Sequence, residues 1–182
     1  MPQKRLFDIA VSGAGLVVLS PLFAVLCALV KYSSRGPVFF RQKRVGRGAR
    51  LFTAIKFRTM YNGTEKHGVI TAASDPRITR LGRILRRLKI DELPQLWNVL
   101  VGNMSLVGPR PEMSFIVEQY GEKQRQRLEV KPGLTGLWQL SGDRAFLIHE
   151  NIEYDLYYIQ HRNLFMDLAI LLHTSIFAMR GI

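Results

Sequence analysis

The sequence contains a single cysteine, Cys27, and only 14 acidic residues against 26 lysines and arginines. One cysteine excludes an intrachain disulfide, so the fold cannot depend on such a bond. The shortage of acids leaves a formal charge of +12, which predicts an anionic partner such as nucleic acid, acidic lipid or a phosphorylated substrate. Internal repeats and a second domain boundary are also absent, and 182 residues suffice for one core.

Charge is missing from residues 9–30, which read IAVSGAGLVVLSPLFAVLCALV. This stretch is long enough to cross a bilayer core. It is too long for the usual secretory signal peptide, and no convincing small-residue cleavage site follows it. Ser20-Pro21 lies near its middle, where a proline removes a backbone hydrogen bond and a neighbouring serine can satisfy the freed carbonyl. The pattern therefore predicts a broken apolar helix.

Basic residues flank this apolar stretch on both sides. Lys4 and Arg5 precede it, a longer basic run follows it, and no acid occurs over 31–64. A spanning helix concentrates positive charge on its cytoplasmic flank, whereas a helix that bends and returns would leave both flanks on that side. The residues alone leave three alternatives open, namely a re-entrant helix, a spanning helix and a buried core helix. We assign most of the basic residues over 31–50 to an anionic membrane surface.

The rest of the chain predicts a mainly α fold with a small β element. A strand-like run follows Gly36-Pro37, and the alternation over 49–60 fits a strand or a short helix. Turn-forming residues predict a loop over 62–76. We expect a basic amphipathic helix over 76–89 and an apolar helix over 93–103. A polar helix is expected over 112–128, and the C-terminal segment over 149–182 is expected to be mostly helical.

Asp91 and Glu92 stand out because they directly follow the basic run that ends at Lys89. If a helix begins at residue 91, both carboxylates lie in its first turn, where free N–H groups and the helix dipole favour anions. Pro94 is tolerated there because first-turn N–H groups have no partner to lose. The simplest interpretation is a capping aspartate that also pairs with a neighbouring arginine.

A second interpretation is chemical, because the nearby cations far outnumber the two acids. A helix N-terminus beside the stiff GPRPE loop suits a phosphate, and a carboxylate pair suits Mg²⁺ that also binds substrate phosphates. Phosphoryl transfer is then plausible, and an aspartate can itself attack phosphorus. The cations that motivate this interpretation are Lys56, Arg58, Arg86, Arg87 and Arg110.

Several segments of the sequence closely resemble motifs of the bacterial sugar transferase family. They are GPVFFRQKRVG, FTAIKFRTM, DPRITRLGRILRRLKIDELPQLWNVLVGNMSLVGPRPE, KPGLTGLWQLSG and EYDLYYIQ. They occur in the family's order and with nearly its spacing, from about residue 3 to the C-terminus. These family members are monotopic polyprenol-phosphate phosphoglycosyl transferases. The resemblance implies transfer of a sugar-1-phosphate from a UDP-sugar to polyprenol (undecaprenyl) phosphate with release of UMP, as the first membrane step of polysaccharide or glycoconjugate synthesis.

The resemblance also implies roles for individual residues. Asp91 would be the nucleophile that forms a covalent phosphosugar intermediate, and Glu92 its partner. Asp91, Glu92 and Asp155 would bind the Mg²⁺ cofactor, and Ser20-Pro21 would be the break of a re-entrant membrane helix. The phosphate- and nucleotide-binding residues would be Lys56, Arg58, Arg87 and Arg110.

The implied organisation is a re-entrant anchor over 1–32 and one catalytic domain over 33–182, with amphipathic helices lying at the membrane surface. The expected location is the cytoplasmic face of the bacterial inner membrane. Membrane lipids are expected as partners and nucleic acid is not, and the protein could form an oligomer. We expect a compact catalytic unit without additional spanning helices. Lys89 and Asn103 depart from the family, which often has Ser or Thr and Asp at these positions.

Two other function classes follow from the composition. A non-catalytic, basic, membrane-tethered binding protein would explain the charge of +12, but it would make no use of Asp91 and Glu92. An ordinary glycosyltransferase or a phosphodiesterase at the membrane is the other alternative. A glycosyltransferase would transfer the sugar without its phosphate and leave a nucleoside diphosphate, so the nucleotide product separates it from the leading hypothesis.

Overall fold

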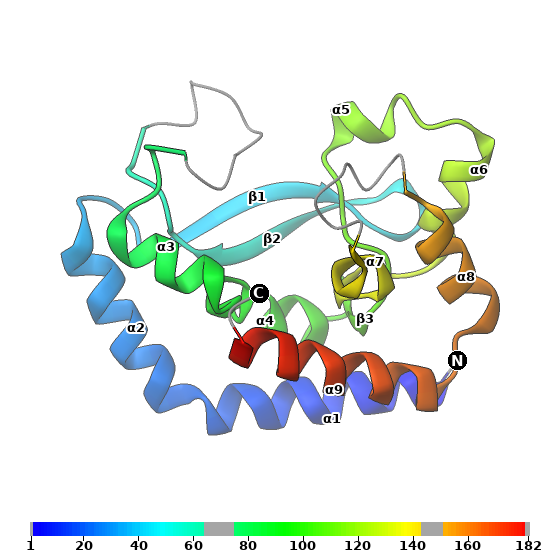
Figure 1. The fold of residues 1–182 in the computed structure, drawn as a ribbon, viewed down its shortest axis with the longest axis horizontal. Helices are drawn as coiled ribbons and strands as arrows, with labels where there is room; N and C mark the ends of the chain where they lie inside the picture. Colours follow the sequence, from blue (N-terminus) through cyan, green and yellow to red (C-terminus); the bar gives the residue numbers. More distant parts are fainter. Residues whose placement is uncertain (1, 64–74, 143–150, 181–182) are drawn as a thin grey trace.

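The computed structural model describes residues 2–63, 75–142 and 151–180. Its fold is mainly helical with two small sheets, which confirms the expected fold class. Figure 1 shows the first N-terminal helix along the lower edge and the second rising at the left, with a β-hairpin across the molecule and further helices around it. Most of the expected 62–76 loop, and the start of the expected C-terminal helix, lie outside the described residues.

The N-terminal helices are α1 (Pro2–Val18) and α2 (Ser20–Ser33). They are bent by 62° at the break between them, which falls at Leu19. The Ser20 hydroxyl donates to the Val17 carbonyl at 2.7 Å, and Pro21 lies in the first turn of α2, where its missing N–H leaves no bond unmade. In the described part of the chain no single helix is long and apolar enough to cross a membrane, although this bent pair meets both criteria jointly.

Polar contacts fix the first half of α1 to the rest of the protein. The carboxylate of Asp8, which is 2% exposed, accepts a hydrogen bond from the Leu106 backbone N–H at 3.1 Å. The Arg5 guanidinium donates to the carbonyls of Val99 and Leu100, at 2.6 and 2.8 Å. Lys4 also pairs with the buried Asp167. The N-terminal helix is therefore positioned by buried charged side chains as well as by apolar packing.

The hairpin consists of β1 (Phe39–Val45) and β2 (Leu51–Phe57), which pair antiparallel around a 3-10 turn, η1 (Arg47–Ala49). The alternation expected over 49–60 is thus that of a strand. Phe40 lies opposite Lys56 and Arg44 lies opposite Phe52. Because side chains alternate between the faces of a strand, Arg44 and Lys56 project from the same face of the hairpin.

The central segment contains α3 (Arg80–Arg87), the 3-10 turn η3 (Ile90–Glu92) and α4 (Gln95–Leu100). The Thr79 hydroxyl caps α3 by accepting from the Gly82 N–H at 2.9 Å, which satisfies one of the free donors of the first turn. In α4, the buried Asn98 amide accepts from the Ile55 N–H and donates to the Thr53 carbonyl, at 3.1 and 2.8 Å. These bonds fix α4 against β2.

Two very short strands, β3 (Ser105–Val107) and β4 (Gly133–Thr135), pair in parallel, and the sequence analysis did not predict them. Strands of three residues are too short to show alternation, so no strand pattern can be recognised in these segments. A Cβ at Gly133 would lie 2.1 Å from the Gly108 nitrogen, so this close backbone approach requires glycine.

The polar helix expected near 112–128 is instead three short helical segments, α5 (Ser114–Val117), α6 (Glu122–Arg125) and η4 (Gln126–Glu129). The interruption comes at Gly121, whose extended backbone (ψ 175°) forms the N-cap of α6. The prediction of one continuous helix was therefore wrong.

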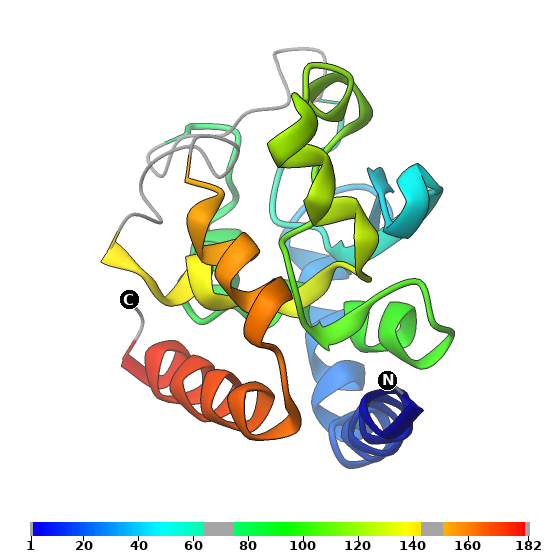
Figure 2. The same cartoon turned by 90° about the vertical axis from the view of Figure 1, so that its right-hand side faces the viewer.

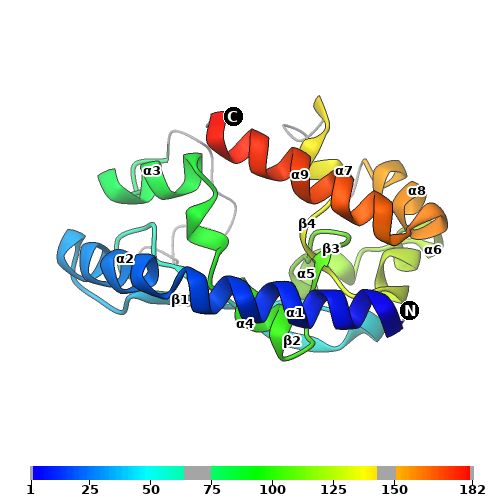
Figure 3. The same cartoon turned by 90° about the horizontal axis from the view of Figure 1, so that it is seen from below.

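The chain continues with α7 (Leu137–Leu140), α8 (Glu153–His161) and α9 (Leu164–Arg180). Figures 2 and 3 show α9 and α1 on the same side of the molecule, and the Lys4–Asp167 ion pair joins the two helices. Exposed apolar side chains occur on both of these helices and on α2, and they include Val17, Val18, Val25, Phe165 and Leu172.

Candidate active site

The acidic pair lies in the turn η3, between α3 and α4. Lys89, directly before it, has a φ of 58° and occupies the left-handed region that residues with side chains rarely adopt. The expected helix start at residue 91 was wrong, because α4 begins at Gln95 after Pro94. The left-handed residue ends α3 and redirects the chain, and a lysine gives no sequence signal for such a turn.

Asp91 is buried, with 6% of its surface exposed. Its carboxylate has no hydrogen-bond or ion-pair partner within the described ranges. Burial raises the pKa of Asp91 and the neighbouring Glu92 raises it further, while Lys56, Arg86 and Arg110 act in the opposite direction. The site therefore holds a basic, unpaired carboxylate among cations.

Glu92 has the opposite environment. Both of its carboxylate oxygens accept from the Arg110 guanidinium, at 2.6 and 3.2 Å, a bidentate pairing that is stronger than a single contact. Burial by itself would raise the pKa of Glu92, but Arg110 and Lys56 outweigh it and lower the pKa to about 2. The two adjacent acids are therefore electrostatically different, since Glu92 is matched by an arginine and Asp91 is not.

Two further cations act on this pair from different elements. Lys56 comes from β2, where burial lowers its pKa and Glu92 and Asp91 partly counteract that effect. Arg86 comes from the last turn of α3, and its Nε donates to the Thr59 hydroxyl at 2.8 Å. The structure thus groups Lys56 and Arg110 with Asp91 and Glu92, as the sequence predicted. It also places Arg86 there, which the sequence analysis counted among the nearby cations without giving it a binding role.

Arg44, on β1, is one of the arginines over 31–50, most of which the sequence analysis assigned to the membrane surface. In the structure it is half-buried, and it interacts electrostatically with Arg110, Glu92 and Glu112. The signal that could have identified it is strand alternation. Arg44 projects from the hairpin face that carries Lys56, whereas its neighbours Arg41 and Lys43 project from the other face and are exposed.

Two of the predicted phosphate-binding residues, Arg58 and Arg87, are not grouped with the acidic pair. Arg58 is 5% exposed, and its guanidinium donates to the carbonyls of Val30, Ser34 and Pro37 at 2.9, 2.6 and 2.5 Å. It therefore holds the C-terminal end of α2 and is not grouped with the acidic pair. Arg87 lies in the last turn of α3, like Arg86, but its side chain is exposed.

Asp155, the third predicted metal ligand, is 1% exposed and binds the Arg127 guanidinium at 2.8 Å. Arg127 also pairs with Glu112 at 2.7 Å and donates to the Arg110 backbone carbonyl at 3.0 Å. Tyr120 completes this buried cluster through a hydrogen bond to Glu112. Within the described residues no three acidic, histidine or cysteine side chains are arranged to hold a metal. Asp155 is therefore not grouped with Asp91 and Glu92, because Arg127 neutralises it elsewhere.

The chemistry of the remaining pair still suits Mg²⁺. This ion prefers carboxylate oxygens and commonly takes one or two of them together with substrate phosphates. The unpaired Asp91 carboxylate is available for such a ligand role, whereas Arg110 already engages both oxygens of Glu92. The residues present therefore fit a magnesium ion bound mainly through Asp91.

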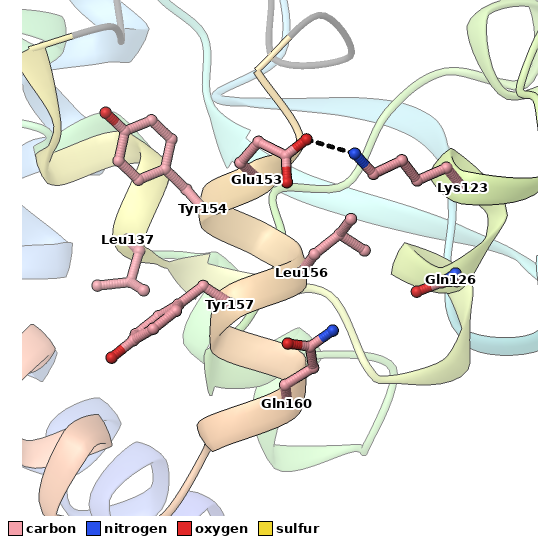
Figure 4. A pocket seen from close by; sticks show the side chains of 8 residues that line it. All are labelled: Lys123, Gln126, Leu137, Glu153, Tyr154, Leu156, Tyr157 and Gln160. Atoms are coloured by element: carbon pink, nitrogen blue, oxygen red, sulfur yellow. Dashed lines mark hydrogen bonds and ion pairs between the residues drawn. The ribbon is translucent and has the colours of Figure 1, made fainter.

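A separate open pocket of about 710 Å³ lies across α8, and its walls include none of the residues discussed above. Figure 4 shows Tyr154 and Tyr157 directed to one side of α8, near Leu137, and the Glu153–Lys123 ion pair on the other. The lining contains one exposed ion pair and no group of unpaired charges. The acidic pair is therefore the better candidate for phosphate chemistry.

Comparisons with known proteins agree with the motifs. The sequence profile of the family described as "Bacterial sugar transferase" matches residues 1–181. The exopolysaccharide production protein ExoY of Sinorhizobium fredii (strain NBRC 101917 / NGR234) is 36% identical over 174 residues, which cover 87% of this chain and 77% of that protein.

Two longer relatives carry more specific names. The UDP-glucose:undecaprenyl-phosphate glucose-1-phosphate transferase of Klebsiella pneumoniae is 43% identical over 169 residues, which cover 88% of this chain and 36% of that protein. The UDP-N-acetylgalactosamine-undecaprenyl-phosphate N-acetylgalactosaminephosphotransferase of Aeromonas hydrophila is 42% identical over 164 residues, which cover 86% of this chain and 39% of that protein. The present chain thus matches less than half the length of either.

Proposed function

Because this chain belongs to the bacterial sugar transferase family, we propose that it transfers a sugar-1-phosphate from a UDP-sugar to undecaprenyl phosphate and releases UMP. The classes of donor and acceptor come from the names of the relatives. The structural observation that carries the proposal is the unpaired Asp91 carboxylate beside the arginine-bound Glu92. The product would begin the assembly of a polysaccharide.

In the first step an oxygen of Asp91 attacks the phosphorus that bears the sugar. The bond between this phosphorus and the oxygen that bridges to the uridine-bearing phosphate breaks, and UMP leaves with the electron pair. The raised pKa of Asp91 makes its ionised carboxylate a stronger nucleophile. Lys56, Arg86 and Arg110 stabilise the negative charge of the transferring group, which is the main requirement of phosphoryl transfer.

In the second step a phosphate oxygen of undecaprenyl phosphate attacks the same phosphorus. The bond from Asp91 to phosphorus breaks, which restores the carboxylate and leaves the sugar on a polyprenyl diphosphate. Because the transfer proceeds in two displacements through a covalent intermediate, the donor and the lipid acceptor need not occupy the site at the same time. Glu92 remains ionised throughout, since its pKa is about 2, and it keeps Arg110 in place.

Asp91 and Glu92 are the residues that would bind Mg²⁺. The ion would supply additional positive charge against the phosphates of the donor. The surplus of Lys and Arg around the pair contributes the same kind of stabilisation from the protein itself.

The substrates place the reaction at a membrane. We infer that α1 and α2 form a re-entrant anchor bent before Ser20-Pro21, with the catalytic residues at the cytoplasmic face. The bend of 62°, the basic residues on both flanks of the apolar stretch and the exposed apolar side chains of α1, α2 and α9 support this arrangement. A polyprenol chain would then reach the site from the lipid.

A panel of UDP-sugars tests the proposal when it is assayed with undecaprenyl phosphate and Mg²⁺ for the nucleotide that is released. The proposed reaction releases UMP from at least one donor, in amounts equal to the lipid-linked product. Release of UDP would instead indicate an ordinary glycosyltransferase. Steeply salt-dependent DNA binding in the absence of turnover would indicate the basic binding protein.

A further inference from the structure

The Arg44 side chain contacts no carboxylate within 4.0 Å in the part of the chain that the structure describes. Its Nη2 donates to the Gln42 amide oxygen at 2.7 Å, and its Nη1 makes a longer contact of 3.3 Å to the Pro111 carbonyl. Both acceptors are neutral. A half-buried guanidinium with only neutral partners has lost part of its hydration without gaining a matching anion, which is energetically unfavourable.

The other buried arginines near this region make more contacts within the folded protein. Arg58 donates to three backbone carbonyls at the end of α2, and Arg127 binds two carboxylates and a carbonyl. Their positions are therefore explained by the folded protein alone. Arg44 has one good contact to an amide and one long contact, so most of its donors remain available.

The position of Arg44 relates it to the acidic pair. It shares a hairpin face with Lys56, and its contact to Pro111 places it at the residue that follows Arg110. Repulsion from Arg110 adds to the effect of burial and lowers the pKa of Arg44 to about 10, while Glu92 and Glu112 attract it. Both of these glutamates are already engaged, by Arg110 and by Arg127 respectively.

The charge balance around the pair indicates what is missing. Glu92 is matched by Arg110. Asp91 interacts with Lys56 and Arg86, and Arg44 interacts with Glu92 of the same pair, so among the described residues Asp91 is the unmatched carboxylate beside Lys56, Arg86 and Arg44. These three cations exceed it by two positive charges. A diphosphate diester, which carries two negative charges, would offset this excess. Guanidinium groups can donate in parallel to phosphate oxygens, and the contact of Arg44 to the Pro111 carbonyl keeps its side chain next to the loop that carries Arg110.

We propose that Arg44 binds the diphosphate of the nucleotide-sugar donor, together with Arg110. This assignment rests on the proposed function, because it takes the donor to be a UDP-sugar. It makes Arg44 a substrate-binding residue, distinct from the exposed arginines of the same hairpin. Of these, Arg41 projects from the opposite face of the hairpin and remains available for lipid headgroups.

The test measures binding of UDP to the full chain in detergent by calorimetry, with Arg44→Gln, Arg44→Lys and the control Arg41→Gln. Arg41 lies on the same strand but on the exposed face. Loss of a charge-assisted hydrogen bond predicts a dissociation constant for UDP about tenfold to a hundredfold higher in R44Q. R44K should lie between R44Q and the unsubstituted protein, and R41Q should remain within about twofold.

Salt dependence separates direct contact from a structural effect. If Arg44 touches phosphate, UDP binding by R44Q weakens less steeply with added NaCl than binding by the unsubstituted protein, because one charge contact is gone. Unchanged affinity in R44Q, equal losses in R44Q and R41Q, or an unaltered salt dependence would overturn the assignment. So would an R44K variant that folds and binds UDP as tightly as the unsubstituted chain. UMP release by the unsubstituted enzyme with none of these binding effects would leave the proposed function standing and remove only the role of Arg44.

Discussion

Two clusters of arginines and carboxylates lie close together in this protein, and they differ in how their charges are matched. In the first, which we call the closed cluster, Arg127 binds Glu112 and Asp155, with Tyr120 beside them, and all four are at most 7% exposed. In the second, the open cluster, Asp91 and Glu92 face more cations than they can neutralise. The main cations of the open cluster are Arg44, Lys56, Arg86 and Arg110.

The difference shows that pairing, more than proximity of charged residues, distinguishes a structural cluster from a functional one. In the closed cluster the Arg127 guanidinium joins η4, α8 and the segment around Arg110, so its charges are consumed by the fold. In the open cluster the strongest pair, Glu92–Arg110, leaves Asp91 without a hydrogen-bond or ion-pair partner among the residues that the structure describes. A bond from Arg127 to the Arg110 carbonyl at 3.0 Å connects the two, so the closed cluster supports the open one.

The largest effect is expected from Asp91→Asn, which removes the nucleophile but keeps its shape. Turnover should fall by on the order of 10⁴-fold or more, as for other residues that form the covalent bond. Because burial raises the pKa of Asp91, the ionised carboxylate is less stable in the folded protein than in the unfolded chain at neutral pH. The amide should therefore leave stability unchanged or raise it, as measured by denaturant unfolding.

The control for this variant is Glu118→Gln, which neutralises an exposed acid outside both clusters and should retain full turnover. A D91N enzyme with undiminished UMP release would mean that the open cluster is not the reactive one.

The next largest effect should come from Arg127→Met and should concern stability. The substitution leaves Glu112 and Asp155 buried without a cation, and breaking a buried pair in this way costs about 3–5 kcal/mol. Chemical denaturation measures the loss. Arg125→Gln, an exposed neighbour whose guanidinium donates to one backbone carbonyl, should cost less than about 1 kcal/mol. Similar stability of R127M and R125Q would show that the closed cluster does not hold the fold.

A smaller effect is expected from Asp155→Asn. This variant shows whether Asp155 supports the site through Arg127 or binds Mg²⁺ itself. Loss of the charged partner of Arg127 should cost about 1–3 kcal/mol of stability. If Asp155 acts only through Arg127, the Mg²⁺ concentration that gives half-maximal turnover stays as in the unsubstituted enzyme. A clear increase in that concentration would place Asp155 among the metal ligands, as the family resemblance implied.

The smallest effect concerns pH. Turnover requires ionised Asp91, so the rate should fall as the pH drops through the pKa of this group, which lies above its ordinary value of 3.8. Lys56 lowers that pKa, so Lys56→Met should shift the acidic limb of the pH–rate profile to higher pH. Lys43→Met, on the exposed face of the hairpin, should leave the limb in place. A shift to lower pH in K56M would contradict the electrostatics of the open cluster.

The sequence predicted the mainly helical fold, a helix break close to Ser20-Pro21 and the family. Strand alternation would also have placed Arg44 beside Lys56, had the hairpin register been known. The left-handed turn at Lys89 was not predictable, because nothing marks a lysine for that conformation. Nor were the partners of Arg58 and Asp155, since long-range contacts to α2 and to Arg127 decide them. Charge excess is visible in a sequence, but which charges are matched depends on the fold.

The central claim is that a carboxylate oxygen at position 91 bonds transiently to phosphorus, and intact-protein mass measurement tests it directly. The enzyme is incubated with a UDP-sugar that it turns over, without acceptor lipid, and then analysed by mass and by peptide mapping. The account predicts that the mass increases by one sugar phosphate, that an equal amount of UMP is released, and that the modified peptide contains Asp91. The same increase in D91N, or a modification that maps to any other residue, would contradict it.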